Sequence, residues 1–574
     1  MRRLIGLCVA GLAAFITPVD ASPLSASNAT SCKCIPGDPC WPNQSVFSRL
    51  NETLQGQLIS TVPLASICHD PKYEEHKCET LKTQWDYAAV HAVDPSSVMM
   101  PVFQNSTCDP FQPVESPCTL GNLVRYSVNA SDARLVQSAI RFAAAHNIQV
   151  AVKNTGHDFL GRSTAKHALG VWTHHMDGME LIRNYTSPMY RGPAMKMGAG
   201  TQAWQAYQAA NSWGYRVVGG SCPTVGLAGG FTQGGGHGVL SSQHGLAADN
   251  VVEWQVVTSS GELVTASPTK NPDLYWALSG GGGGTFGVVV SMTTKLFPEA
   301  PVTGGRLDFN FTSEESFWGA VSVLQSGLTP LVDSGTVLLV GVTNSTASAV
   351  LTAPEVDKPT LEGQLGYITS HLKQSAIPYD LTVQTDPSYY DHFSRYFGPL
   401  PHGIWPVSHL MGGRLLPRSL FESPTLTASL AELGKSITRN NEWTISAVTL
   451  NVNHTVAQTT DTSNSVHPAW RDTLAHYTVY SPWDWSSAAE MNQRSDRLTK
   501  EIIPALEELT PGGATYANEA DYRQADWQTA FYGPTWDRLS RIKSKWDATG
   551  VLYAPLSAGA DSWQEKPDGR LCRV

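Results

Sequence analysis

The 574-residue sequence lacks the motifs of several common protein classes. It has no G-x-x-x-x-G-K-[ST] phosphate loop, and neither a C-x-x-C nor an H-E-x-x-H metal spacing occurs. The net charge is −10, without a basic tract or an aromatic–basic stripe, which disfavours nucleic acid as a partner. Beyond the N-terminus, no apolar run is long enough to cross a bilayer.

The first residues, in contrast, follow the pattern of a secretory signal peptide. Arg2 and Arg3 precede a short apolar stretch from Leu4 to Ile16, and small residues end it at Ala21. We therefore expect residues 1–21 to be removed, and the mature chain to be a soluble, secreted, extracellular protein with no membrane partner.

Sequons for N-glycosylation are frequent, as in a glycoprotein that passes through the secretory pathway. They begin at Asn28, Asn43, Asn51, Asn105, Asn129, Asn184, Asn310, Asn344 and Asn453. We expect N-linked glycans on the surface of a monomer.

The cysteines are unevenly distributed, as expected for an N-terminal segment that is held together by disulfides. Seven lie between Cys32 and Cys118, one is at Cys572, and Cys222 stands alone. The eight could form four disulfides in an oxidising compartment, but their pairing cannot be deduced from the sequence. Two short local loops favour Cys68 with Cys78 and Cys108 with Cys118, and Cys572 would then tie the C-terminus to the N-terminal segment.

A glycine-rich stretch around Cys222 is the most unusual part of the sequence. Residues 217–240 read VVGGSCPTVGLAGGFTQGGGHGVL and contain nine glycines. Glycine allows another backbone or a ligand to come close, so a large flat or phosphorylated ligand is expected here. A linker is the alternative, but linkers are rich in serine and lack apolar residues at intervals.

The chain before this stretch predicts a β-α-β unit. Leu123–Val128 alternates like a strand, Leu135 to Ala143 has helical spacing after an Asp132 cap, and Gln149–Val152 reads as the next strand. The turn that follows, KNTGHDFLGRS, could present backbone N–H groups to phosphate.

The run GGGGGTFG at 280–287 could be taken for a dinucleotide fingerprint of the NAD type. That fingerprint follows a strand and opens a helix. Here the run follows the expected helix Asn271–Leu278 and opens the expected strand Val288–Leu296, which disfavours NAD.

Five motifs in order carry a family resemblance. They are TGH at 155–157, SCPTVGLAGGFTQGGGHG at 221–238, GLAADNV at 245–251, DLYWALSGGGGGTFGVV at 273–289, and the tail from YANEAD to GVLYAP. This order resembles the berberine-bridge-enzyme-like branch of the vanillyl-alcohol-oxidase superfamily, in its fungal secreted form. The resemblance covers roughly residues 120–300 and 510–565; the segment between matches only loosely.

The resemblance implies an α+β fold with a two-subdomain, PCMH-type FAD-binding domain and a substrate domain whose antiparallel sheet is covered by helices. With the signal peptide at 1–21 and a Cys-rich segment at 22–115, the FAD domain is expected at 116–300. The substrate domain would span 301–510, and residues 511–574 would complete the FAD domain. No metal is implied.

The same resemblance gives roles to two isolated residues. His157 stands where the family's histidine bonds the flavin 8α-methyl, and Cys222 where its cysteine bonds flavin C6, so the cofactor is expected to be bicovalent FAD. Imidazole and thiolate are suitable nucleophiles for these electrophilic positions. The alternatives are a locally hydrogen-bonded turn histidine and a buried, inert thiol. Many relatives carry Arg-Ser-Gly-Gly before the histidine, where this chain has Lys153-Asn154-Thr155-Gly156.

Further cofactor contacts carry over by position in the matching motifs. They are Asn154, Thr155, Gly156, Asp158, Gly161, Arg162, Ser163, Thr224, Val225, Gly226, Gly229, Gly234, Gly235, Asp249, Asn250, Val251, Gly283, Gly287, Val288, Tyr516 and Asn518.

Three residues are candidates for the chemistry itself. Glu519 replaces a tyrosine of relatives and could act as base if an apolar flavin raised its pKa; the alternative is a salt-bridged structural carboxylate. His237 is a second candidate for base or substrate contact. Val225 corresponds to a position beside flavin C4a, where small aliphatic residues accompany oxygen reactivity; simple packing is the alternative.

These residues predict an FAD-dependent oxidase that converts an alcohol C–OH of a sugar, polyol or phenolic or secondary-metabolite alcohol, with O2 giving H2O2. An oxidative cyclase or C–C/C–N oxidase of secondary metabolism is the enzymatic alternative. A non-catalytic flavin- or carbohydrate-binding protein is the alternative from another class.

Overall fold

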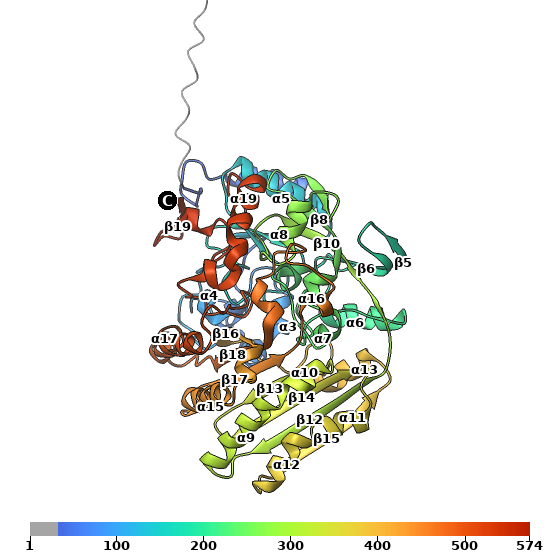
Figure 1. The fold of residues 1–574 in the computed structure, drawn as a ribbon. Helices are drawn as coiled ribbons and strands as arrows, with labels where there is room; N and C mark the ends of the chain where they lie inside the picture. Colours follow the sequence, from blue (N-terminus) through green and yellow to red (C-terminus); the bar gives the residue numbers. More distant parts are fainter. Residues whose placement is uncertain (1–31) are drawn as a thin grey trace, which may run out of the picture.

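The structure is a computed structural model that describes residues 32–574. The expected signal peptide, Cys8 and the Asn28 sequon lie outside the described residues. Two bodies make up the molecule. The upper part of Figure 1 contains the four- and five-stranded sheets and helix α19 (Trp536–Trp546), and the lower part contains the seven-stranded sheet. Within residues 32–574, every helix is too short or too polar to cross a lipid bilayer.

The first sheet of the upper body contains the expected β-α-β unit. Its strand order is β1-β2-β4-β3, with β2, β4 and β3 parallel and β1 antiparallel to β2. Helix α5 (Ala133–Ala145) begins where the Asp132 carboxylate accepts hydrogen bonds from two backbone N–H groups. The strands are β1 (Leu58–Ser60), β2 (Tyr126–Asn129), β3 (Val150–Lys153) and β4 (Leu169–Trp172).

The second sheet is antiparallel, in the order β5-β6-β10-β8-β9. It contains a hairpin, in which β8 and β9 pair from Trp254 with Ala266 to Val257 with Leu263. Its strands are β5 (Met179–Thr186), β6 (Arg191–Gly198), β8 (Val251–Val257), β9 (Leu263–Ala266) and β10 (Val288–Lys295). Helices α6 (Ala203–Ser212), α7 (Ser241–His244) and α8 (Pro272–Leu278) belong to the same part of the chain.

The lower body is built on a seven-stranded antiparallel sheet in the order β15-β12-β14-β13-β17-β18-β16. The strands are β12 (Val302–Asn310), β13 (Val337–Val342), β14 (Thr346–Pro354), β15 (Tyr379–Asp386), β16 (His409–Pro417), β17 (Thr444–Thr449) and β18 (Thr473–Pro482). The helices are α9 (Glu314–Ser326), α10 (Leu328–Asp333), α11 (Lys358–Gln364), α12 (Gly366–Gln374), α13 (Tyr389–Phe397), α14 (Arg418–Phe421), α15 (Pro424–Thr438) and α16 (His454–Ala457). The antiparallel sheet with covering helices matches the expected fold class.

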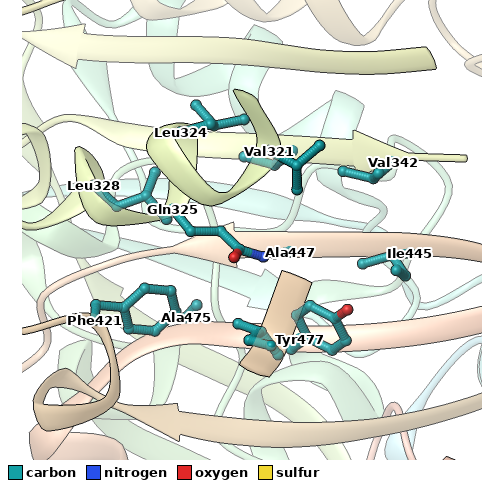
Figure 2. Close-up of a pocket in the computed structure, with 12 residues that line it drawn as sticks. Val321, Leu324, Gln325, Leu328, Val342, Phe421, Ile445, Ala447, Ala475 and Tyr477 are labelled. Carbon is teal, nitrogen blue, oxygen red and sulfur yellow. The ribbon is translucent and has the colours of Figure 1, made fainter. Parts of the chain in front are cut away.

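The two faces of this sheet pack against different parts of the molecule. Tyr477 and Val479 of β18 point into the core beneath the helices, whereas the alternate residue His476 faces the upper body. On the helix side, a cavity of about 30 Å³ is lined by α9 and the sheet. Figure 2 shows its lining side chains, with Gln325 of α9 directed toward the sheet. That volume suits about one water molecule, so it is not a substrate site.

The N-terminal segment is stapled as its short loops suggest. Cys68 pairs with Cys78 and Cys108 with Cys118, and Cys34 pairs with Cys40. Cys32 bonds Cys572 across 540 residues, which confirms the expected link between the two ends of the chain. The segment contains α1 (Gln44–Thr53), α2 (Glu75–Gln84), α3 (Ala88–Ala92) and α4 (Pro101–Gln104).

The C-terminal segment returns to the upper body. After α17 (Ala488–Arg497) and α18 (Ile503–Leu509), α19 (Trp536–Trp546) is anchored there by Lys543, which donates to the Thr285 carbonyl at 2.8 Å and to Asp547 at 2.6 Å. Leu552 forms a bridge with Val150 of β3. The upper body is therefore assembled from two parts of the chain.

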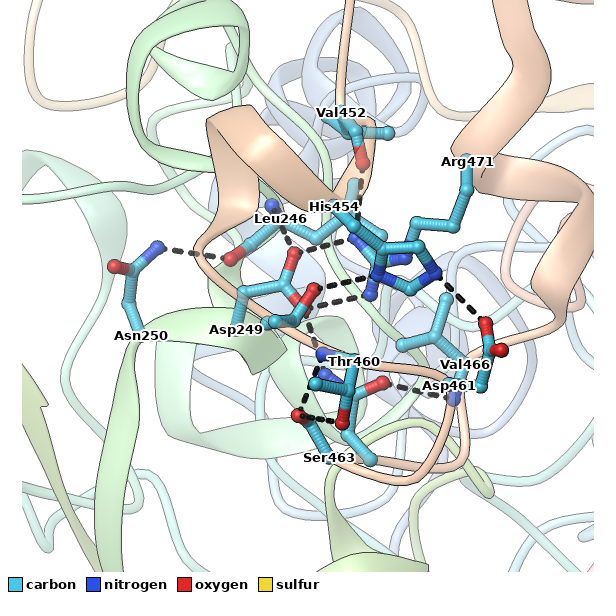
Figure 3. A network of polar contacts seen from close by, with 12 residues as sticks. Leu246, Asp249, Asn250, Val452, His454, Thr460, Asp461, Ser463, Val466 and Arg471 are labelled. Atoms are coloured by element: carbon cyan, nitrogen blue, oxygen red, sulfur yellow. Dashed lines mark hydrogen bonds and ion pairs between the residues drawn. The ribbon is translucent and has the colours of Figure 1, made fainter. Parts of the chain in front are cut away.

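A buried ion pair joins the two bodies (Figure 3). Asp249, whose side chain is completely buried, accepts two hydrogen bonds from Arg471 and one from Asn464, at 2.6 to 2.9 Å. Its second oxygen also accepts the Leu246 backbone N–H at 2.8 Å. Asp249 lies just before β8, and Arg471 just before β18, so the contact fixes one sheet against the other.

The sequence patterns indicate the upper body better than the lower one. Of the seven lower strands, only β13 and β17 coincide with strand-like runs of the sequence, at Thr336–Val342 and Trp443–Asn451. In β18, Thr473 to Val479 are all buried, so the period-2 alternation that marks a half-exposed strand is absent.

We predict that Asp249→Ala lowers the free energy of unfolding by about 3–5 kcal/mol, because it leaves the Arg471 guanidinium buried without its partner. Denaturant unfolding followed by tryptophan fluorescence measures this. Asp308→Ala removes a surface pair with Arg306 and should cost less than about 1 kcal/mol. Equal losses in the two variants would show that the Asp249 network does not join the bodies.

Candidate functional site

The glycine-rich stretch is a place where backbones touch, as its composition indicates. A side chain at Gly238 would place its first carbon 1.8 Å from the Gly219 carbonyl oxygen. Gly226 and Gly229 both lie against Asn154 of the turn after β3. A side-chain carbon added to Gly226 would lie 2.3 Å from the Asn154 side chain, and one added to Gly229 would lie 2.8 Å from it. The stretch and the turn therefore form one compact layer, which excludes the linker alternative.

This layer brings His157 and Cys222 together around one hydroxyl. The Thr224 hydroxyl lies 2.7 Å from Nε2 of His157 and 3.6 Å from the Cys222 sulfur. Burial lowers the pKa of His157 to about 3, with Lys153 and His91 adding to the effect, so its imidazole is neutral. Burial also raises the pKa of the Cys222 thiol, which the Thr224 hydrogen bonds partly oppose. Cys222 is the free cysteine of the described chain.

Lys153, at the end of β3, makes its hydrogen bonds to the N-terminal segment and not to His157 or Cys222. Its ammonium donates to the carbonyls of His91 at 3.0 Å and Asp94 at 2.7 Å, in the N-terminal segment. Burial lowers the pKa of Lys153 to about 7, and Asp94 opposes that shift. The lysine thus joins the N-terminal segment to the site layer.

An arginine suited to phosphate lies beside the same layer. Arg162 is 8% exposed; its Nε donates to Asp158 at 2.5 Å and its Nη2 to the Asn518 side chain at 3.0 Å. Its Nη1 is buried and has no partner among the described residues. A guanidinium with an unpaired N–H in a buried position suits a phosphate oxygen.

Other buried polar atoms of this region also have no partner within residues 32–574. They are Asn154 Oδ1, Thr201 Oγ1, Thr232 Oγ1 and Gln233 Oε1. Buried polar atoms are almost always hydrogen-bonded in native proteins. The residues therefore fit a large ligand with several polar groups and a phosphate, such as FAD.

The candidate catalytic residues meet across the two bodies. Oε1 of Glu519 lies 3.2 Å from Nε2 of His237, and Oε2 lies 3.4 Å from Nδ1 of His476 in β18. His237 and His476 are 7% and 1% exposed, whereas the Glu519 side chain is 31% exposed. The carboxylate is therefore the accessible member of the group.

The pKa of Glu519 is lowered, whereas the role of base considered from the sequence assumes a raised pKa for this carboxylate. Burial would raise it, but the neighbouring His237 and His476 lower the pKa of Glu519 to about 2. Burial lowers the pKa of His476 to about 3, against the opposing effect of Glu519. At neutral pH the carboxylate is ionised and the His476 imidazole is neutral.

Tyr516 and Asn518 support this group. The Tyr516 hydroxyl accepts the Gly236 backbone N–H at 3.2 Å and the Asn518 amide at 2.8 Å. Burial raises the pKa of Tyr516, so it stays protonated. Trp470 packs with its ring centre 5.4 Å from that of Tyr516 and 5.8 Å from that of His237.

Several expected cofactor contacts instead have protein partners. Asp249 is occupied by Arg471, Asn464 and Leu246, and the Asn250 amide donates to the carbonyls of His244 and Leu246. Gly287 packs on Val256: a side-chain carbon added to Gly287 would lie 2.3 Å from the Val256 side chain.

The remaining expected contacts divide between strands and the site layer. Val251 begins β8 and Val288 begins β10; both are buried. Gly156 lies against Lys153, Gly161 against Phe103, Gly234 against Asn518 and Gly283 against Gly230. Thr155 is buried, Ser163 and Val225 are partly buried, and Gly235 has a φ of 118° beside Tyr516.

The sequence patterns do not reveal His476 or His409. Both histidines lie on strands of the lower sheet and reach the site only through the packing of the two bodies. The ring of His409 lies 5.2 Å from Phe159, beside His157, and burial lowers the pKa of His409 to about 4. No local motif surrounds either residue.

Two family descriptions match the chain. "FAD binding domain" matches residues 124–267, and "Berberine and berberine like" matches residues 515–558. The FAD-linked oxidoreductase ZEB1 of Gibberella zeae is 43% identical over 557 residues, 96% of both chains. The VAO-type flavoprotein oxidase VAO615 of Thermothelomyces thermophilus is 41% identical over 555 residues, again 96% of both.

Solved structures share the fold. The VAO-type flavoprotein MtVAO615 of Myceliophthora thermophila has a TM-score of 0.91 at 40% identity, covering 95% of this chain and all of the other. A glucooligosaccharide oxidase from Acremonium strictum, described with a 6-S-cysteinyl, 8α-N1-histidyl FAD, has a TM-score of 0.65 at 18% identity, covering 76% of this chain and 92% of the other.

We predict that Gly238→Ala reduces the ratio of bound flavin to protein several-fold, because the new methyl group would meet the Gly219 carbonyl and separate the segments of the layer. Absorbance of the purified protein measures the ratio. Gly319→Ala is the matched control, since Gly319 is exposed on α9 with open space around it. If both variants kept the full ratio, the backbone contact would not be needed for flavin binding.

Proposed function

The chain belongs to the FAD-linked oxidoreductases of the VAO type that have a berberine-like C-terminal segment, and from this we propose that it oxidises an alcohol group of a small molecule through bicovalently attached FAD. When bound, FAD supplies the acceptor for the hydride of the carbinol carbon, and O2 reoxidises it with release of H2O2. The substrate classes we favour are sugars, polyols and phenolic or secondary-metabolite alcohols.

The arrangement around Thr224 supports two covalent bonds. His157 and Cys222 both contact the same hydroxyl, so their reactive atoms are close enough to serve one ring system. The neutral imidazole of His157 has a free electron pair for bond formation. Because burial keeps the Cys222 thiol protonated, its proton must leave during attachment, and the thiolate is then the reacting form.

The single observation that carries the alcohol oxidation is the accessible carboxylate of Glu519 between two imidazoles. In our proposal the substrate hydroxyl donates its hydrogen bond to Glu519, and the proton released during oxidation enters the Glu519–His237–His476 group as a unit. His237 and His476 hold the two oxygens, while Tyr516 and Asn518 fix the backbone on which Glu519 lies.

Oxygen reactivity and location complete the proposal. Val225 follows Thr224 directly and is partly buried, as suits a small residue beside the ring. The four disulfides of residues 32–574 suit an oxidising compartment, which supports secretion. The glycosylated, monomeric state is part of the same proposal and rests on the sequons.

We predict that acid precipitation of the wild-type protein leaves the yellow flavin in the pellet. His157→Ala and Cys222→Ala should each keep the flavin attached through the other residue, and the double variant should release it to the supernatant. Peptide mass spectrometry identifies each bond. A colourless wild-type pellet would contradict covalent attachment. Complete release of the flavin from one of the single variants would show that only the substituted residue forms a bond.

We predict that Glu519→Gln lowers the rate of flavin reduction by an alcohol by about 10²-fold or more, because an amide cannot take the proton. Since the pKa of Glu519 is lowered to about 2, the carboxylate is ionised from pH 5 to pH 8, and the wild-type rate should show no rise through pH 6–7 from its deprotonation. Anaerobic stopped-flow measurements give both results.

The exposed Glu315→Gln on α9 is the control and should reduce at the wild-type rate. An unchanged rate in Glu519→Gln would remove Glu519 from the role of base. A panel of alcohols, oligosaccharides and phenolic compounds, assayed for H2O2, identifies the substrate class. Flavin reduction without an alcohol oxidation product would favour the oxidative cyclase.

A further inference from the structure

Glu519, His237 and His476 have a geometry that their proposed part in proton transfer does not require. One ligand atom from each of the three residues lies within 4.8 Å of the others. Two imidazoles and one carboxylate are a donor set that zinc uses in proteins, with open positions left for water or substrate. The chain therefore presents a potential metal-ligand group at the junction of its two bodies.

The separations of the ligand atoms fit a small metal ion. Tetrahedral bonds of about 2.0–2.1 Å place neighbouring ligand atoms about 3.3 Å apart. Nε2 of His237 is 3.2 Å from Oε1 of Glu519, and Nδ1 of His476 is 3.4 Å from Oε2.

The bonding of His476 is an independent indication of a missing partner. This residue is 1% exposed, yet neither ring nitrogen makes a hydrogen bond with any described residue. Buried imidazole nitrogens are normally hydrogen-bonded or bound to a metal. Nδ1 faces the Glu519 carboxylate at 3.4 Å, a direction that suits a shared cation.

The charge of the group favours a cation. Among the ion pairs of the described residues, Glu519 is paired only with His237 and His476; no lysine or arginine reaches it. Glu519 is thus a carboxylate without a lysine or arginine partner, placed between two buried imidazoles. Such charges are normally paired or bind a metal.

We propose that Glu519, His237 and His476 form a binding site for one divalent transition-metal ion of the Zn²⁺ type, and that the ion, when bound, takes the Glu519 carboxylate away from the substrate. The second part rests on the proposed role of Glu519 as base. Nitrogen ligands exclude Mg²⁺ and Ca²⁺, which prefer oxygen. The site is distinct from Cys34, Asp38 and Cys40, whose sulfurs form a disulfide.

The site is tested on the flavin-loaded protein, first treated with a chelator. Titration calorimetry with Zn²⁺ should give one ion per chain and no binding heat for Mg²⁺. Co²⁺ should give visible absorption at wavelengths longer than the flavin bands, as expected of a tetrahedral nitrogen–oxygen site. Glu519→Gln and His476→Gln should each weaken Zn²⁺ binding by about 10²-fold or more, because each removes a ligand.

His454→Gln is the matched control, because His454 forms a comparable pair with Asp461 at 2.8 Å on the surface and should not affect Zn²⁺ binding. Flavin content and thermal unfolding show that each variant is folded. Absence of Zn²⁺ binding to the wild-type protein would overturn the site. Unchanged affinity in both ligand variants would overturn it as well.

The effect on the reaction is tested separately. Zn²⁺ should lower the rate of flavin reduction in proportion to the occupancy measured by calorimetry, and a chelator should restore the rate. A rate that is unchanged at full occupancy would overturn the competition for Glu519. If no alcohol reduces the flavin, the proposed function fails, but the calorimetric result still decides whether the metal site exists.

Discussion

The contact between two backbones at Gly219 and Gly238 is the constraint on which the site depends. Because nothing larger than hydrogen fits there, the chain can fold back on itself between Cys222 and His237. That return places Cys222 and Thr224 on one part of the layer and His237 on another, and Gly226 and Gly229 join the layer to the turn that carries His157. A larger residue at any of these glycines would separate the segments that carry His157, Cys222 and His237.

Burial determines the ionisation of the site. It keeps His157, His409 and His476 neutral, with pKa values lowered to about 3 or 4, while the pKa of Glu519 is lowered to about 2 and its carboxylate is ionised. Neutral imidazoles and an ionised carboxylate are thus present in the same region. The upper body alone cannot produce this state, because His409 and His476 come from the lower sheet, and Asp249 with Arg471 holds that sheet in place.

The sequence predicts the parts of the site that depend on local chemistry. The glycines, His157 and Cys222 are visible because they break the surrounding composition, and the β-α-β unit because its spacing is regular. The pKa of Glu519 could not be predicted, since its direction depends on His237 and His476. Both are distant from Glu519 in sequence, and His476 lies on a strand without alternation. The pairing of Asp249 could not be predicted for a related reason: its partner Arg471 is 222 residues away and visible only in the fold.

The disulfide between Cys32 and Cys572 has a consequence for biosynthesis. The β3 strand is made early, but its neighbour Leu552 and the anchoring Lys543 are made much later. The upper body therefore cannot close before these residues are made, whereas the lower body, continuous in sequence, is available to fold earlier. A translation product that stops before Lys543 would lack both the disulfide with Cys32 and part of the flavin-binding body.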